Sequence, residues 1–425
     1  LHGQARGSYS HLSWAREADH LAFAASIFDD EGEGGDAEIW VWAGQEPSAV
    51  VTAADAPEGF AVPSANELEW SRDGARLFFG FKYVGGAEAE DDSSGSGSGS
   101  GSDEDEKPFD PYDFDAILEG RGVDVWHWND PRIISNQKER WEEHEKNRVY
   151  RAVIHLDDRA VVPLATLDLP EVFPTDNSSF ALAGSDLPYL REITWDGTYG
   201  DVFVVNLRTG KQHPVVERLS VGWRGSSASL SPDGRSVLFY QAGDWHLWSV
   251  ETSEAVNLTA ALEVPFANED HDYPMDPPGY GHSEWMADSS SVLIYDKYDI
   301  WQVFTDDRKP RLLTAGAGRE NHVVYRVEDL DPDEDVIAVG TDLLLSAYHD
   351  VEKHDAFAAL DVDQGSIRSL YATGRHKLHV EGKAVEADRV LFTRERYEEF
   401  PDLWVTNLDF EKPTKFSNAN PQIAD

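Results

Sequence analysis

The serines of this chain are the first place to look for chemistry, because a serine on a sharp strand-to-helix turn beside a general base becomes a nucleophile. The nearest approach to the Gly-x-Ser-x-Gly pattern of such a turn is Gly225-Ser226-Ser227-Ala228-Ser229. It lacks the closing glycine and runs into Ser231-Pro232-Asp233-Gly234, a turn that precedes a strand and not a helix. We therefore expect these serines to be strand and loop residues.

No other residue set forms a self-contained catalytic centre. The chain has no glycine-rich phosphate loop followed by Lys-Ser or Lys-Thr and no His-Glu-x-x-His pair. It has no cysteine, which excludes disulfides, thiol catalysis and cysteine-based zinc sites. The 15 histidines are dispersed, and four in or beside strand patterns are expected to be packing residues: His11, His127, His246 and His322.

Two acidic segments contain residue types that bind metals. The loop 261–282 includes the run Asn268-Glu269-Asp270-His271-Asp272, for which a solvated acidic loop is the interpretation we favour over a metal site. The run Asp103-Glu104-Asp105-Glu106 lacks the glycine hinge and the spaced ligands of a calcium loop. We therefore predict no metal and no cofactor.

A short strand pattern recurs seven times and indicates the elements that position these residues. Each copy is an acidic residue, an apolar residue, usually an aromatic, any residue and an apolar residue. The later copies begin 43 to 56 residues apart, close to the roughly 40–50 residues of one propeller blade. The first two intervals are longer because they contain insertions. The copies begin at Glu38, Asp124, Asp201, Asp244, Asp299, Asp355 and Asp402.

A second pattern, an apolar anchor followed by a polar turn and a β-rich run, precedes several copies. It begins at Trp14, Trp70, Leu230 and Trp285. Consecutive hairpins of this kind predict an all-β fold, a β-propeller of about seven four-stranded blades, with eight as the alternative count. An ordinary β-sandwich is the other fold considered, but seven copies with regular late spacing disfavour it. The aromatic residues of the copies are expected to belong to the core between blades.

Composition limits the partners. The chain has 425 residues, 80 of them acidic and 36 basic, and its net charge of −44 repels nucleic acid and anionic membranes. No apolar run is long enough to span a membrane. Because the acidic residues are spread over all the repeats, we expect a protein from a high-salt environment. Periplasmic, secreted and cytoplasmic locations all stay open.

Three segments interrupt the repeats. Residues 86–107 alternate Gly and Ser between acidic clusters, which predicts a disordered, flexible surface insertion. Residues 131–148 are highly charged and predict a helical insertion with Ser135 as its N-cap, and 149–165 predict a hairpin. We assign residues 1–417 to the propeller and 418–425 to the start of a linker.

Four segments together resemble the N-terminal propeller of bacterial S9-family serine peptidases, the prolyl oligopeptidase group. They are VDVWHWNDPR (123–132), WDGTYGDVFVV (195–205), LFTRERYEEFPDLW (391–404) and FSNANPQ (416–422). The resemblance implies an α/β-hydrolase domain with a Ser-Asp-His triad in the same polypeptide, beginning near Asp425. No triad residue falls within this chain, so we expect it to be a fragment, and whether the chain alone is an enzyme stays open.

The resemblance further implies that the propeller restricts access to the active site and admits short peptides. Charged residues before the last repeat strand would then hold a peptide terminus: Arg394 its carboxylate, and Glu398 and Glu399 its amine, with Glu395 beside them. A solvated hairpin tip is the alternative for these four residues. The alternative for the whole chain is a stand-alone propeller of the TolB or WD40 kind that acts as a protein-binding scaffold.

Overall fold

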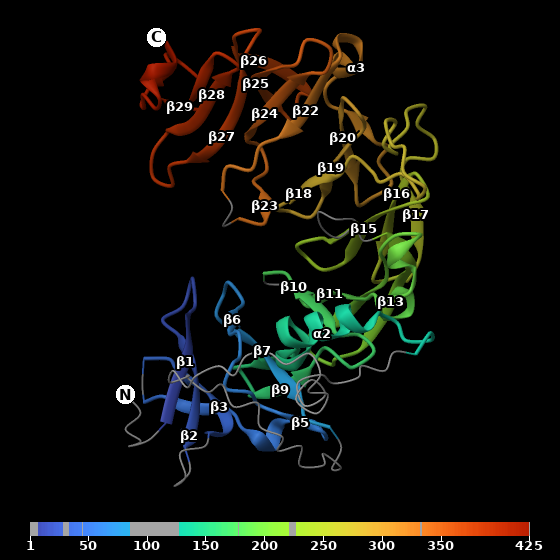
Figure 1. Ribbon diagram of the computed structural model, residues 1–425, viewed down its shortest axis with the longest axis vertical. Helices are drawn as coiled ribbons and strands as arrows, with labels where there is room; N and C mark the ends of the chain where they lie inside the picture. Colours follow the sequence, from blue (N-terminus) through green and yellow to red (C-terminus); the bar gives the residue numbers. More distant parts are fainter. Residues whose placement is uncertain are drawn as a thin grey trace, which may run out of the picture. The chain divides into compact units, whose positions relative to one another are not determined.

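The computed structural model describes residues 7–28, 34–44, 46–85, 127–176, 178–220, 227–331 and 334–424. In these residues the strands form seven sheets, and each sheet contains four antiparallel strands in a row (Figure 1). Seven sheets of this kind are consistent with a seven-bladed propeller and confirm the all-β prediction. The chain divides into two compact units, Leu1–Pro170 and Glu171–Asp425, which are described one at a time.

The first unit contains two sheets. One consists of β1 (Gly7–Trp14), β2 (Leu21–Phe28), β3 (Gly34–Trp42) and β4 (Ser48–Val51). The other consists of β5 (Phe60–Ala61), β7 (Arg76–Tyr83), β8 (Val149–His155) and β9 (Ala160–Pro163), with β6 (Glu69–Trp70) also paired to β7. Apolar side chains from both sheets form one buried cluster that includes Ile39, Leu77 and Ile154.

The second unit contains five sheets. The first two are β10 (Glu171–Pro174), β11 (Phe180–Ser185), β12 (Tyr199–Asn206), β13 (Gln212–Ser220), and β14 (Ala228–Leu230), β15 (Ser236–Gln241), β16 (Asp244–Ser249), β17 (Ala255–Asn257). The third is β18 (His282–Met286), β19 (Ser291–Tyr295), β20 (Ile300–Phe304) and β21 (Arg311–Leu312), with β23 (Val336–Ile337) added in parallel to β18. The last two are β22 (Val323–Val327), β24 (Asp342–His349), β25 (His354–Asp361), β26 (Ser366–Ala372), and β27 (Lys377–Lys383), β28 (Val390–Arg396), β29 (Glu399–Thr406), β30 (Thr414–Lys415).

Within this unit, each sheet packs on the next sheet along the chain. One buried cluster joins β10–β13 to β14–β17, the next joins β14–β17 to β18–β21, and two more continue the series to β27–β30. An inner sheet of this series therefore buries apolar residues on both faces, as a propeller blade must. Figure 1 shows these sheets following one another in chain order from green to red.

The acidic residue that opens a repeat strand is a hydrogen-bond acceptor. Asp299 Oδ1 accepts the hydroxyl of Thr314 at 2.6 Å, and Thr314 Oγ1 accepts the backbone N–H of Ile300 at 3.2 Å. The same two bonds link Asp244 to Thr259 and Asp402 to Ser417, each a hydroxyl residue 15 positions later. This arrangement, called the Asp–hydroxyl clasp below, ties the start of the third strand to the segment that follows the fourth strand.

The turn between the first two strands also repeats. Ser71 and Ser231 each donate a hydroxyl hydrogen bond to the aspartate two residues later, at 2.6 and 2.7 Å. Gly74 and Gly234 follow with φ of 67° and 71°, and a Cβ on Gly234 would lie 2.2 Å from Ser178 Oγ. At Gly234, glycine therefore suits both the positive φ and the lack of space for a side chain.

Some predictions about these elements need correction. The third strand of the second sheet is β8, which carries no copy of the repeat; Asp124 to Trp126 and the 86–107 insertion lie outside the described residues. Helix α2 (Ile134–Glu143) falls within the predicted helical segment, but its N-cap is Ile133 and not Ser135. The second helix, α3 (Ala317–Asn321), follows β21.

The aromatic rings of the repeat are less buried than expected. Phe357 is fully buried, whereas the third-position rings in the other described strands are only half-buried. The positions on either side of the ring supply more of the core, for example Ile300 and Val204. The ring therefore covers the edge of the core in most blades.

No helix in the described part of the chain is long and apolar enough to cross a membrane.

Candidate functional site

The four residues predicted from the sequence gather at the β28–β29 hairpin. Arg394 and Glu395 lie on β28 itself, Glu399 begins β29, and only Glu398 lies in the turn. Arg396 pairs with Glu399 as the last cross-strand pair before the turn. The sequence predicted that these residues lie in a loop. In the structure the strand pairing continues through most of them, so that only a short turn separates β28 from β29.

Glu399 is held by one histidine and two arginines. Its carboxylate accepts a hydrogen bond from His376 Nε2 at 3.0 Å and lies 2.7 Å from Arg396 Nε and 3.8 Å from Arg394 Nη2. Burial would raise the pKa of Glu399, but the His376 hydrogen bond and the two arginines outweigh it and lower the pKa. His376 is only 4% exposed, and its Nδ1 accepts the Thr373 hydroxyl at 2.7 Å. The Glu399 carboxylate therefore stays ionised and already has its partners.

Arg394 is also occupied. Its guanidinium lies over the Trp404 ring, 3.9 Å from the ring centroid, and Nη1 donates to the Tyr371 hydroxyl at 3.2 Å. A guanidinium stacked on tryptophan is stabilised by the ring quadrupole and keeps a fixed orientation. Arg394 thus lines the site with its guanidinium already in contact with Trp404 and Tyr371, and it is less available to bind the carboxylate of a ligand.

The two remaining glutamates differ in exposure. Glu395 lies 3.1 Å from Lys377 on the neighbouring strand β27. Glu398 is 74% exposed at its side chain, and its nearest cation is Arg396 at 3.6 Å. The turn residue Tyr397 beside it is fully exposed. Among the four predicted residues, Glu398 therefore offers the carboxylate most open to a ligand.

The segment after β30 returns to this hairpin. Asp402 accepts hydrogen bonds from Ser417 Oγ at 2.7 Å and from the Ala419 N–H at 2.8 Å, and Lys415 Nζ lies 2.6 Å from it. Burial raises the pKa of Asp402, but the bonds from Lys415, Ala419 and Ser417 outweigh burial and lower it. Hairpin and returning segment enclose a cavity of about 450 Å³, lined by Arg394, Glu398, Glu399, Phe400, Asp402, Trp404, Lys415 and residues 418–421.

Sequence reasoning missed His376, Trp404 and Lys415 as members of this site. His376 lies on the connection between β26 and β27, far from the hairpin in sequence, and no local pattern marks it. Trp404 is the aromatic residue of the last repeat copy, and the aromatic residues of the copies were predicted to lie in the core between blades. The spacing of Ser417 from Asp402 was visible as the third example of the 15-residue interval and could have located the returning segment.

The other residues considered for catalysis or metal binding have structural contacts in the part of the chain that the structure describes. In the 268–272 run, Glu269 lies 3.0 Å from Arg319 and Asp270 lies 2.9 Å from Lys297. The described residues contain no group of three or more His, Asp or Glu side chains placed to hold a metal ion. Ser227 donates its hydroxyl to the Ser220 carbonyl, and Ser226 lies outside the described residues.

Comparison with known proteins gives fold similarity only. No family model and no curated protein matches the chain. Among solved structures, a prolyl endopeptidase is 11% identical over 97% of this chain and 50% of its own, with a TM-score of 0.39. A Pyrococcus horikoshii acylaminoacyl peptidase is 12% identical over 98% of this chain and 53% of its own, with a TM-score of 0.33.

A third similarity lies outside the peptidases. An oligogalacturonate lyase in complex with manganese is 10% identical over 98% of this chain and 87% of its own, with a TM-score of 0.37. The chain spans about half the length of the two solved peptidases. What the described structure itself establishes is a mostly β chain whose seven sheets are consistent with a propeller; its function must be inferred from its own residues.

Proposed function

We propose that this propeller is the non-catalytic, substrate-gating part of a serine peptidase of the prolyl oligopeptidase group. In this proposal a hydrolase domain on the same polypeptide cleaves short peptides, and the propeller limits which peptides reach it. The proposal rests first on the four sequence segments that resemble such propellers, taken in their order along the chain.

One contact in the second unit supports the proposal most strongly. The segments RERYEEFPDLW and SNANPQ, which carry much of the resemblance, are hydrogen-bonded to each other through Asp402, Ser417 and Ala419. The charged hairpin and the exit of the chain from the last sheet therefore lie at the same end of that sheet. A domain joined after the last sheet would begin beside the cavity lined by Glu398 and Trp404.

The geometry narrows the roles proposed for the four charged residues. Glu398 is the residue we propose for the amino terminus of a peptide, because its carboxylate is open to solvent. Arg394 and Glu399 are proposed to position the hairpin, because each is already engaged by neighbouring side chains. Glu395, paired with Lys377, is proposed to brace β28 against β27.

The test uses the polypeptide that carries both propeller and hydrolase domain. Glu398→Gln should lower kcat/KM about tenfold or more for peptides with a free amino terminus, since a hydrogen bond to a charged group contributes about 1.5–3 kcal/mol. For the same peptides with an acetylated amino terminus, Glu398→Gln should leave kcat/KM unchanged. Glu381→Gln, an exposed glutamate on β27, is the matched control.

An unchanged kcat/KM of Glu398→Gln on free-amino peptides would overturn the assignment of Glu398. Activity that does not depend on peptide length would overturn the gating role itself. A gene product that binds partner proteins but hydrolyses no peptide would favour the scaffold alternative.

A further inference from the structure

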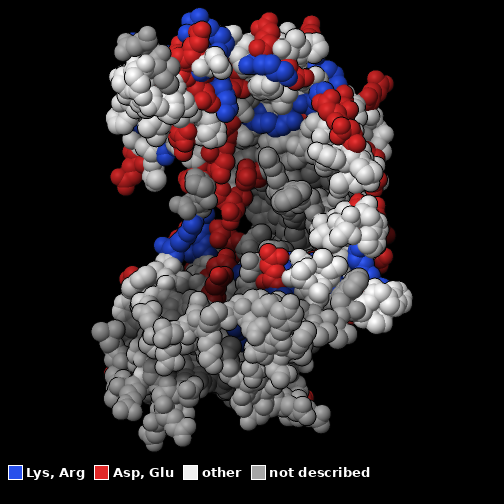
Figure 2. Space-filling model, in the orientation of Figure 1, with Lys and Arg blue, Asp and Glu red and all other residues white. Residues whose placement is uncertain are grey.

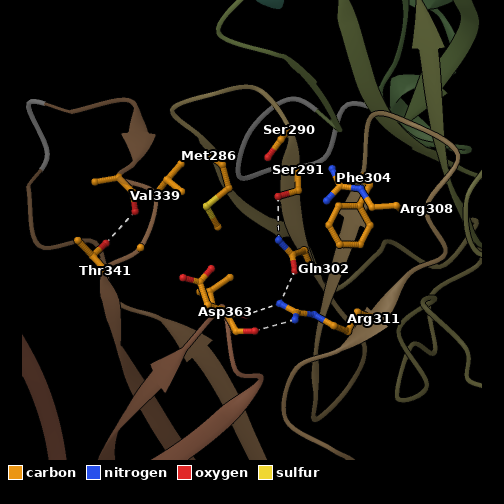
Figure 3. A pocket seen from close by; sticks show the side chains of 13 residues that line it. Met286, Ser290, Ser291, Gln302, Phe304, Arg308, Arg311, Val339, Thr341 and Asp363 are labelled. Carbon is orange, nitrogen blue, oxygen red and sulfur yellow. Dashed lines mark hydrogen bonds between the residues drawn. The ribbon is translucent and has the colours of Figure 1, made fainter.

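A second site in the second unit begins with a row of polar side chains across β19, β20 and β21. Gln302 on β20 is only 7% exposed. Its Nε2 donates to Ser291 Oγ at 2.9 Å, and its Oε1 accepts from Arg311 Nη2 at 2.7 Å. Figure 3 shows the Gln302 amide between the two. The two bonds fix the amide so that its oxygen faces the guanidinium.

This polar row departs from the repeat to which it belongs. Gln302 occupies the fourth position of its repeat copy. The copy at Asp124 has His127 there, and the other five copies have an apolar residue: Val41, Val204, Leu247, Ala358 and Val405. Arg311 lies three residues before Thr314, the hydroxyl of its Asp–hydroxyl clasp. The same place is held by Val256 before Thr259 and by Thr414 before Ser417. The hydrogen bonds along the row offset the cost of burying its polar groups and fix their orientation.

The polar row forms one side of a cavity of about 380 Å³ (Figure 3). The cavity lies at the turns that follow the first and third strands of two neighbouring sheets, whereas the candidate site described above lies at the turn after a second strand. Met286, Phe304 and Val339 supply apolar surface. Hydroxyls and charges come from Ser290, Arg308, Thr341 and Asp363.

Arg311 lacks a carboxylate partner. Within the part of the chain that the structure describes, no acidic side chain lies within ion-pair distance of its guanidinium. Its Nη1 donates to the Asp363 backbone carbonyl at 3.0 Å, Nη2 donates to the Val362 carbonyl, and the buried Nε has no hydrogen-bond partner among the described residues. Arg311 is half-buried, and this chain has more than twice as many acidic as basic residues from which an ion partner could come.

The neighbouring arginine shows the contrast. Arg308 lies 2.8 Å from Asp306 and stacks on Phe304, 4.0 Å from the ring centroid. Its charge is therefore balanced within the protein. Among the described lining residues, Arg311 is the cation without a carboxylate at ion-pair distance, and its guanidinium donates to neutral oxygens.

The chemistry of the lining points to a class of ligand. A guanidinium forms its strongest bonds with planar carboxylates and with phosphates, and the hydroxyls of Ser290 and Thr341 suit a ligand with hydroxyl groups. The Asp363 carboxylate on the same cavity disfavours a dianion. A volume of 380 Å³ is at the small end of ligand pockets. We propose that this cavity binds a small organic monocarboxylate bearing a hydroxyl group, with Arg311 pairing with the carboxylate.

Lactate is a suitable probe, and its neutral amide lactamide is the matched comparison. At constant ionic strength, calorimetric titration and saturation-transfer NMR of the propeller chain should show saturable lactate binding. We expect lactamide to bind about tenfold more weakly or not at all, because it cannot pair with the Arg311 charge. Inorganic phosphate should also bind more weakly than lactate.

The repeat itself supplies replacements that the fold accepts. Gln302→Val introduces the apolar residue type found at this position in most other copies, and Arg311→Val introduces the residue found at Val256. Arg311→Gln keeps hydrogen-bonding capacity without the charge. We expect Arg311→Val and Arg311→Gln to abolish lactate binding and Gln302→Val to weaken it about tenfold. Arg368→Gln, which removes a surface arginine paired with Asp409, should leave binding unchanged.

Two outcomes would overturn this proposal. One is the absence of saturable lactate binding to the unaltered chain. The other is equal binding by the unaltered chain and folded Arg311→Gln, with folding checked by the thermal unfolding transition. Lower stability of Arg311→Gln together with no lactate binding to the unaltered chain would show that Arg311 only clamps the 362–363 turn.

Discussion

The hydroxyl group of Thr314 links two buried groups of adjacent residues, the Asp299 carboxylate and the Ile300 N–H. It donates to Asp299 and accepts from the Ile300 N–H, and both Thr314 and Asp299 are almost fully buried. The same clasp occurs at Thr259 and Ser417. Where the clasp forms, the acidic residue of the repeat fixes the conformation at the start of its strand. At Asp402 the clasp also lies in the candidate site.

Thr314→Val tests the clasp. Valine has nearly the same shape but leaves the Ile300 N–H without its acceptor and Asp299 without one donor. We expect the free energy of unfolding to fall by about 1–3 kcal/mol, measured by urea denaturation in concentrated KCl. Thr252→Val in an exposed turn is the control, and equal stabilities of the two variants would contradict the clasp.

At the scale of residues, the sequence predicted where the charged hairpin lies but not which partners its side chains have. That Arg394, Glu395, Glu398 and Glu399 lie together followed from their closeness in the chain. That Glu399 is engaged depends on His376, which arrives from another connection, and on the strand register that places Arg396 opposite it. Such pairing is tertiary and leaves no local signal.

At the scale of elements, turns and hairpins were the most predictable features. The Asp-Gly turns at Gly74 and Gly234 are formed as expected, because few residues other than glycine adopt their positive φ. In the Trp285 copy, Ser289 takes the equivalent place with a φ of 59°. The predicted hairpin of 149–165 is also present, as β8 and β9.

The details of the elements that sequence reasoning missed are their pairing partners and their ends. β23 has two residues, and it is a strand only because it pairs with Trp285 and Met286 of β18. β8 replaces the repeat copy at Asp124 as the third strand of its sheet, since it pairs along its whole length with β7. Helix α2 begins before the predicted cap Ser135, and its N-cap Ile133 makes no side-chain capping bond.

At the scale of the whole molecule, charge is the dominant property. The chain carries a net charge of −44. On the face shown in Figure 2, acidic side chains are spread among basic ones over the sheets of the second unit and are not confined to one patch. Mutual repulsion of so many like charges opposes the compact state, and salt weakens it: the Debye length falls from about 10 Å at 0.1 M to about 3 Å at 1 M.

Thermal unfolding in a KCl series tests this property. We expect the midpoint to rise by more than about 5 °C between low and molar KCl, and to continue rising above 0.2 M because the Debye length still shortens over that range. A parallel series in sucrose, which stabilises by exclusion without screening charge, should give a smaller rise. A flat midpoint in KCl would contradict the expectation.

The central claim is that this propeller serves a serine hydrolase encoded in the same polypeptide. The most direct measurement is fluorophosphonate labelling of the whole gene product, with the labelled residue identified by peptide mass spectrometry. We predict labelling of one serine in a Gly-x-Ser-x-Gly turn beyond residue 425, and none within residues 1–425. Absence of labelling, or a labelled serine within residues 1–425, would contradict the claim.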